Sequence, residues 1–207
     1  MPRFNMKSRR RPAQSARPPG QPVNLSIGSQ GPGLESHQTN VQLPAMKPGA
    51  PLLLIDVDGV ISLFGFDQTE PPKGRFTFVD GLPHYLSERA ADRLARLHPT
   101  FECVWCTGWE DRADEHLPHL LGIPRGWHHL TVPQEPLPAA HWKLAAIDAY
   151  AGPDRPVAWI DDAHDDTCHA WAEQRPGPTL LVATDPAVGI TDAHVETLLS
   201  WGRAASG

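Results

Sequence analysis

The chain has 207 residues, 40% of them hydrophobic, and its 24 acidic and 18 basic side chains give a formal net charge of −6. This length and apolar content predict one domain with its own core plus a short extension. No run of about 18 apolar residues suggests a membrane span, and the three cysteines are too few for a disulfide framework. We therefore expect a cytoplasmic protein that does not cross a membrane.

Residues 1–49 are rich in Pro, Gly and Ser and hold few large apolar side chains. The first fifty residues carry seven Lys or Arg and one acid, a net charge of +6, which leaves −12 for residues 51–207. Such a segment cannot bury enough apolar surface to offset its ordering entropy, so we predict a disordered tail. Its basic run KSRRRP is typical of a solvated tail and also suits contact with nucleic acid or another polyanion.

From Pro51 onward, short apolar runs alternate with patterns of helical spacing. The apolar runs predict strands over residues 52–56, 101–107, 129–132, 156–162 and 179–184. The helical patterns cover residues 82–98, 109–122, 138–152, 163–175 and 191–205. Nearly continuous apolar strands that alternate with helices indicate a parallel sheet covered on both faces. For residues 50–207 we predict an α/β fold, a three-layer Rossmann-like parallel sheet with helices on both faces.

Four residues mark the ends of the predicted helices. Gly122 and Gly152 stand at the ends of two helical patterns, where glycine is the favoured C-cap. Thr191 precedes the last helix and is a suitable N-cap. Pro118 lies inside the pattern over 109–122 and marks a point where that helix would break.

The sequence CVWC matches a C-x-x-C pattern, with Cys103 and Cys106 in the strand predicted over 101–107. Residues three apart on a strand point to opposite faces of the sheet, so the two thiols should diverge. This geometry disfavours a redox pair or a zinc site. We expect buried structural cysteines instead.

Polar residues gather where the predicted strands end. Two follow the first strand, two follow the second, two end the strand over 156–162, and one lies on the helix before that strand: Asp56, Asp58, Thr107, Gly108, Asp161, Asp162 and Lys143. In an open parallel sheet, ligands bind beyond the carboxyl ends of the strands, near the switch in strand order. We therefore expect these side chains to converge at one edge of the sheet.

The types of these residues suit phosphoryl transfer. Four clustered carboxylates would repel one another unless a cation lay among them, and oxygen donors without clustered His or Cys favour Mg²⁺. Thr107 offers a hydroxyl, the N–H groups after it open a predicted helix that suits an anion, and Lys143 adds a positive charge. A carboxylate nucleophile, an acid/base, a metal and a phosphate clamp would then be present. The alternative is that Asp56 and Asp58 are turn residues and Lys143 is an exposed helix lysine.

Four sequence motifs resemble those of the haloacid dehalogenase-like superfamily, in the same order and at similar spacing. They are D-V-D-G-V at 56–60, T-G at 107–108, Lys143, and D-D at 161–162. The longer stretches LLLIDVDGVIS, VWCTGWEDRA, HWKLAAIDAYAG and AWIDDAHDD are similar to the haloacid dehalogenase domain associated with Swiss-army-knife RNA repair proteins. This resemblance covers about residues 51–203.

The resemblance implies a phosphatase that acts through an aspartyl-phosphate. Asp56 would attack phosphorus, and Asp58 would protonate the leaving oxygen and then activate water. Thr107, with the backbone of Gly108 beside it, would hold phosphoryl oxygens, and Lys143 would balance charge on the nucleophile and the phosphate. Positioning of this kind lowers a barrier by roughly 7–11 kcal/mol.

The resemblance also implies Mg²⁺ as the cofactor. Its protein ligands would be the Asp56 carboxylate, the backbone carbonyl of Asp58 and Asp162. Asp161 would orient this group or share the role of Asp162, and the sequence leaves that choice open.

Two further residues follow the second motif on the opening turn of a predicted helix. Trp109 could stack on a base of the substrate or pack against the sheet. Arg112 could grip a second phosphate bidentately or form a surface ion pair with Glu110 or Glu115.

Only a short segment separates the first motif from the first predicted helix. Residues 64–81, FGFDQTEPPKGRFTFVDG, are largely polar and rich in proline. They suit a flap, and we expect a minimal cap or no cap domain. An open site of this kind admits a large substrate, such as a nucleic-acid end, as well as a small one.

Three functions remain open at this point: a phosphohydrolase acting on nucleic-acid or nucleotide phosphates, a phosphatase of small metabolites, and a catalytically silent domain that binds a phosphorylated partner. The net charge of −12 on residues 51–207 argues against a broad nucleic-acid groove, which would be basic, and the basic tail could compensate. A repair role would need partners in trans.

Overall fold

The computed structural model of the chain describes residues 49–131 and 140–206. Residues 1–48 of the predicted tail lie outside this part, as do position 132 of one predicted strand and positions 138–139 of one predicted helix. Those predictions remain untested.

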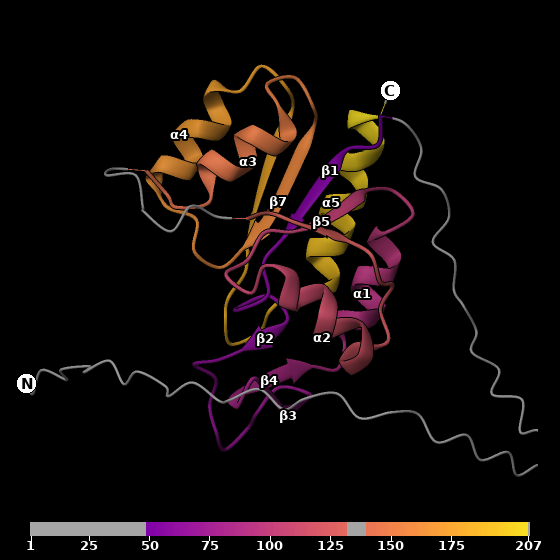
Figure 1. Cartoon of the computed structure of the whole chain (residues 1–207), viewed down its shortest axis with the longest axis vertical. Helices are drawn as coiled ribbons and strands as arrows, with labels where there is room; N and C mark the ends of the chain where they lie inside the picture. The colour runs from indigo at the N-terminus through magenta and orange to yellow at the C-terminus, as the bar shows by residue number, and fades with distance from the viewer. Residues whose placement is uncertain (1–48, 132–139, 207) are drawn as a thin grey trace, which may run out of the picture. The chain divides into compact units, whose positions relative to one another are not determined.

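A five-stranded parallel sheet forms the centre of the domain (Figure 1). Its strands, in spatial order β6-β5-β1-β7-β8, are β6 (His128–His129), β5 (Glu102–Trp105), β1 (Leu52–Ile55), β7 (Val157–Asp161) and β8 (Thr179–Ala183). The chain moves from β1 to β5 and β6 on one side and then returns to β7 on the other. The switch in strand order therefore falls at β1, where ligands bind in open α/β sheets.

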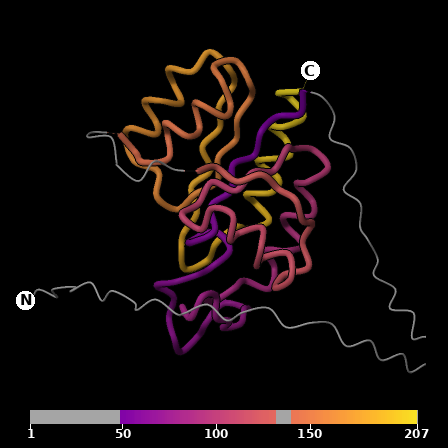
Figure 2. The backbone as a smooth tube through the Cα atoms, viewed as in Figure 1, coloured from indigo at the N-terminus to yellow at the C-terminus, as the bar shows by residue number. Residues whose placement is uncertain are grey.

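Five helices cover the two faces of this sheet, as Figures 1 and 2 show. They are α1 (Ala90–Leu97), α2 (Asp111–Leu121), α3 (Leu144–Ala151), α4 (Asp166–Gln174) and α5 (Asp192–Ala205). One core contains buried residues of α1, α2 and α5, and a second core contains those of α3 and α4. The predicted three-layer α/β fold is confirmed. No helix in residues 49–131 and 140–206 is long and apolar enough to cross a membrane.

The strands divide their side chains between the two cores. Leu53 and Ile55 belong to one core, while Leu52 and Leu54 belong to the other, and all four are fully buried. Burial on both faces explains why the β1 sequence is a continuous apolar run. Residues Cys103 and Cys106 likewise lie in different cores as free, buried thiols, so the predicted divergence is confirmed.

The helix predicted over 82–98 is wrong in its first part. Residues Leu82–Ser87 form strand β4, which pairs antiparallel with β3 (Gly74–Val79) and with β2 (Ser62–Leu63). Asp80 and Gly81 connect β3 to β4 with φ of 51° and 80°, the backbone that a two-residue type I′ hairpin turn requires. The predicted flap thus contains β3 and belongs to a small three-stranded sheet, which lies at one end of the domain (Figure 1).

Most of the predicted helix ends agree with the structure. Gly122 ends α2 in the left-handed conformation, Gly152 ends α3, and the side chain of Thr191 caps α5. Pro118 does not break α2, which continues to Leu121.

Candidate functional site

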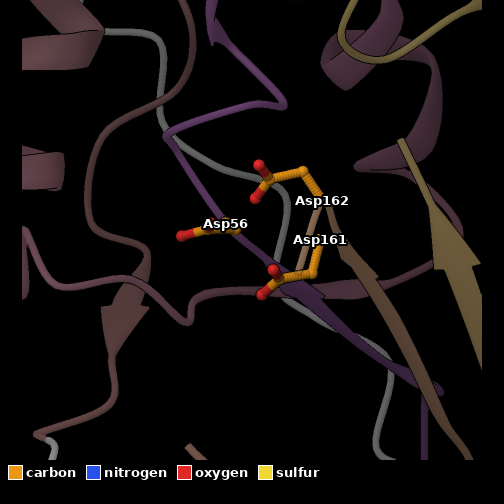
Figure 3. A group of neighbouring side chains, drawn as sticks. All are labelled: Asp56, Asp161 and Asp162. Carbon is orange, nitrogen blue, oxygen red and sulfur yellow. The ribbon is translucent and has the colours of Figure 1, made fainter. Parts of the chain in front are cut away.

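The acidic side chains of the site follow two neighbouring strands. Asp56 comes directly after β1, and its N–H donates to the carbonyl of Ile160 on β7 over 3.1 Å. Asp161 is the last residue of β7, and Asp162 follows it. One carboxylate oxygen from each of Asp56, Asp161 and Asp162 lies within 4.8 Å of the other two. Figure 3 shows these three side chains, whose carboxylates project to the same side.

Lys143 joins two of these carboxylates in the interior. Its Nζ lies 3.1 Å from Oδ1 of Asp56 and 2.6 Å from Oδ2 of Asp161, and the lysine is 2% exposed. Burial lowers the pKa of Lys143, but the attraction of the surrounding negative groups, Asp56 foremost, outweighs it and raises this pKa above the ordinary value. The ammonium is therefore charged at neutral pH. The alternative of an exposed helix lysine is wrong.

Both carboxylate oxygens of Asp161 accept hydrogen bonds within the protein. Besides Lys143, its Oδ2 accepts from the indole N–H of Trp159 over 3.0 Å, and its Oδ1 accepts from the backbone N–H of Ala163 over 3.0 Å. The residue has no exposed surface. These contacts fix Asp161 as the group that orients Lys143.

Burial makes the charge of Asp56 costly. It raises the pKa of Asp56 to about 7, against the lowering effect of Lys143 and with a further increase from Asp161. Burial, followed by the charge of Asp161, also raises the pKa of Asp162. Carboxylates whose charge is disfavoured by burial and by one another gain from a shared cation. Their oxygen donors fit a hard divalent ion such as Mg²⁺.

The turn after β1 leaves room for the Asp162 side chain, because residue 59 is a glycine. A Cβ at Gly59 would lie 2.3 Å from Cγ of Asp162, and Gly59 has φ of +72°. Both the space and the backbone therefore require glycine here. The turn is closed by the N–H groups of Ile61 and Ser62, which donate to the carbonyl of Val57.

Asp58 is not one of the three carboxylates whose oxygens lie within 4.8 Å of one another, although its charge acts on Asp162. Its Oδ2 accepts from the indole N–H of Trp109 over 2.9 Å, and its Oδ1 lies 3.7 Å from Nδ1 of His84 on β4. The Asp58 side chain is half exposed. His84 also lies 3.1 Å from the hydroxyl of Ser62. His84 was not predicted as a site residue, because it falls within the helix predicted over 82–98.

The two residues expected to contact the substrate make contacts within the protein. Trp109 is 6% exposed and packs its ring 4.5 Å from that of His84, centroid to centroid. Little of its surface is open to a base. Arg112 pairs with Asp80 of the β3–β4 turn over 3.0 Å.

Thr107 is buried just after the end of β5, which pairs with β1, but its surroundings differ from the prediction. Its hydroxyl accepts from the N–H of Trp109 over 3.3 Å, and its carbonyl accepts from the N–H of Glu110. Helix α2 begins only at Asp111, so the residues after Thr107 form a turn and not the start of a helix. Gly108 is exposed in this turn.

A parallel sheet with helices on both faces, a D-x-D turn after its first strand and a buried lysine between two strand-end aspartates define a haloacid dehalogenase-like domain. A model of the family described as "HAD domain in Swiss Army Knife RNA repair proteins" matches residues 52–195, and the chain belongs to this family. The resemblance found in the sequence is thereby confirmed. A search of curated proteins returned no match to the chain.

Proposed function

We propose that this domain is a Mg²⁺-dependent phosphohydrolase that forms an aspartyl-phosphate on Asp56. Membership of the family indicates a hydrolase of the haloacid dehalogenase type. The observation that carries the proposal is the buried Lys143, held between Asp56 and Asp161 beside the partly buried Asp162. Two carboxylates and an ammonium are costly to bury, and a phosphoryl-transfer site gives each of them a task.

In the first step, a carboxylate oxygen of Asp56 attacks phosphorus and the bond from phosphorus to the leaving oxygen breaks. Asp58 donates a proton to that oxygen, since its carboxylate is half exposed and, within the described part of the chain, makes no ion pair with Lys143. In the second step, Asp58 accepts a proton from water, which attacks phosphorus, releases phosphate and regenerates Asp56. Lys143 holds the Asp56 carboxylate in place, and Thr107 and Gly108, which follow the neighbouring strand β5, would hold phosphoryl oxygens.

The carboxylates of Asp56 and Asp162 and the backbone carbonyl of Asp58 would hold Mg²⁺. Asp161 is the poorer candidate because Lys143, Trp159 and Ala163 already occupy its oxygens. When bound, the ion supplies positive charge to phosphoryl oxygens as negative charge develops on them.

We place the substrate among nucleic-acid or nucleotide phosphate ends. The family is described from RNA repair proteins, and the segment between Asp58 and α1 forms only the small β2-β4-β3 sheet, which is too short to be a cap domain that would restrict access. A repair role would use partners in trans and could use the basic residues 1–49 on a polyanion.

The test is Mg²⁺-dependent phosphate release by the full chain from an aryl phosphate, nucleotides, sugar phosphates, and oligonucleotides phosphorylated at the 3′ or 5′ end. We expect release by the wild type and by Asp92→Asn, a control at an exposed helix position, and none by Asp56→Asn. Equal release by Asp56→Asn would sink the mechanism. A preference for sugar phosphates would favour the metabolite phosphatase, and Mg²⁺ binding without release from any substrate would favour a silent phosphate-binding domain.

A further inference from the structure

Trp142 is an exposed aromatic side chain immediately before the catalytic lysine. It is 40% exposed, whereas the other tryptophans in the described residues are buried or partly buried. Trp105, Trp109, Trp127 and Trp159 are all buried. Covering this open ring surface with an apolar partner would be favourable.

The ring of Trp142 lies beside the residues that would handle phosphate. Its centroid is 4.9 Å from Nζ of Lys143, and that nitrogen is 3.1 Å from Oδ1 of Asp56. On its other side, Cη2 of Trp142 lies 3.8 Å from the position a Cβ would take on Gly108. The indole thus reaches from the start of α3 to the turn after β5, along the rim of the site.

Neither core packing nor charge pairing accounts for this position. The ring belongs to neither of the two cores. Lys143 already forms ion pairs with Asp56 and Asp161. A cation–π contact with Trp142 therefore adds little to the stabilisation of its charge. What the protein presents at this point is open indole surface next to the phosphate-binding turn.

We propose that Trp142 is a stacking platform for the nucleobase of the substrate and a determinant of its specificity. The inference rests on the proposed function and narrows its substrate to phosphates carried by a nucleoside, free or at a strand end. A nucleobase stacks on an aromatic ring largely irrespective of sequence. Trp142 therefore takes the role that the sequence suggested for Trp109, whose ring is buried.

The experiment measures equilibrium binding by calorimetry in the presence of Mg²⁺, with the full chain carrying Asp56→Asn so that no ligand is turned over. The probes are adenosine 5′- and 3′-monophosphate and the corresponding ribose phosphates, which lack the base. We expect at least one adenosine phosphate to bind about 5- to 150-fold more tightly than its ribose counterpart, the range of one base–aromatic stack.

Adding Trp142→Ala should remove most of this ratio, and Trp142→Phe should keep a large part of it. Phe78→Ala is the matched control, because Phe78 is an exposed aromatic on β3 and should leave the ratio unchanged. The proposal is overturned if no adenosine phosphate is preferred over its ribose counterpart. It is equally overturned if Trp142→Ala leaves the affinity ratio unchanged. Equal weakening of the binding of both ligands of a pair is one form of this outcome and would mean that Trp142 acts only through Lys143.

The two proposals fail in different ways. A base preference that depends on Trp142, combined with a wild type that releases no phosphate, would sink the hydrolase and keep the stacking site. Turnover that needs Asp56 but shows no base preference in binding would keep the hydrolase and sink the stacking site.

Discussion

Replacing Lys143 with methionine tests whether the buried ion cluster is organised as described. Methionine keeps the length and apolar stem of the lysine but removes the ammonium that lies 3.1 Å from Asp56 and 2.6 Å from Asp161. Two buried carboxylates then face each other without their cation. Breaking a buried pair in this way costs about 3–5 kcal/mol, which for a domain of this size lowers the melting temperature by roughly 6–20 °C.

The assay is thermal unfolding followed by circular dichroism, in EDTA, at pH 5 and pH 8. The loss should be greater at pH 8, because a larger share of the carboxylates that have lost their cation is neutralised by protons at pH 5. Adding Asp56→Asn should recover part of the stability by removing one of the two charges. Arg112→Met is the control, since it breaks the exposed pair with Asp80 and should cost only about 0.2–1 kcal/mol. Equal melting of Lys143→Met and wild type would refute the buried cluster.

The remaining predictions concern the turn, the pH response and the metal. Gly59→Ala should cost more than about 1 kcal/mol and weaken Mg²⁺ binding, because a Cβ at φ +72° would lie 2.3 Å from Cγ of Asp162; wild-type melting and affinity would contradict this. Without metal, folded Asp56 has its pKa raised from 3.8 to about 7, mainly by burial, so the folded state holds a proton that the unfolded state has lost. Its contribution to stability should therefore be lost as the pH rises from about 4 to 7. If the unfolding free energies of the wild type and of Asp56→Asn changed with pH in the same way over this window, the raised pKa of Asp56 would be excluded. Added Mg²⁺ should raise the melting temperature of the wild type by preferential binding to the folded state, and Asp162→Asn should reduce this rise while the exposed Asp92→Asn should not; an unchanged rise in Asp162→Asn would remove that residue from the ligand set.

The sheet and the acidic group could be predicted because their causes are local. A buried parallel strand is a continuous apolar run, so Leu52–Ile55 is recognisable, and the carboxyl ends of parallel strands meet at one edge. Asp56, Asp161 and Asp162 were therefore placed together correctly. The choice between Asp161 and Asp162 as metal ligand depends on which carboxylate oxygens already accept hydrogen bonds in the folded protein. No sequence pattern gives this information.

The β3–β4 hairpin was missed although a signal was present. Asp-Gly at 80–81 between apolar runs is a strong hairpin signal, but the spacing of Leu86, Ala90 and Leu94 resembled one helix face. All three are buried as that spacing suggested, yet Leu86 reaches the core from a strand. The helical period held only from Ala90 onward, and tertiary pairing with β3 decided the rest.

The small sheet has a consequence for how the two aspartates of the D-x-D turn divide their roles. Asp56 is buried beside Lys143, so its carboxylate is oriented and shielded from water, as a nucleophile requires. Asp58 is half exposed and is held by Trp109 and His84, which places it on the side of β4 and leaves it able to exchange protons with solvent. Two chemically identical side chains, two positions apart, thus have different surroundings, as the proposed division into nucleophile and acid/base requires. Because His84 lies on β4, a segment whose sequence resembles the start of a helix supplies part of the environment of the proposed acid/base.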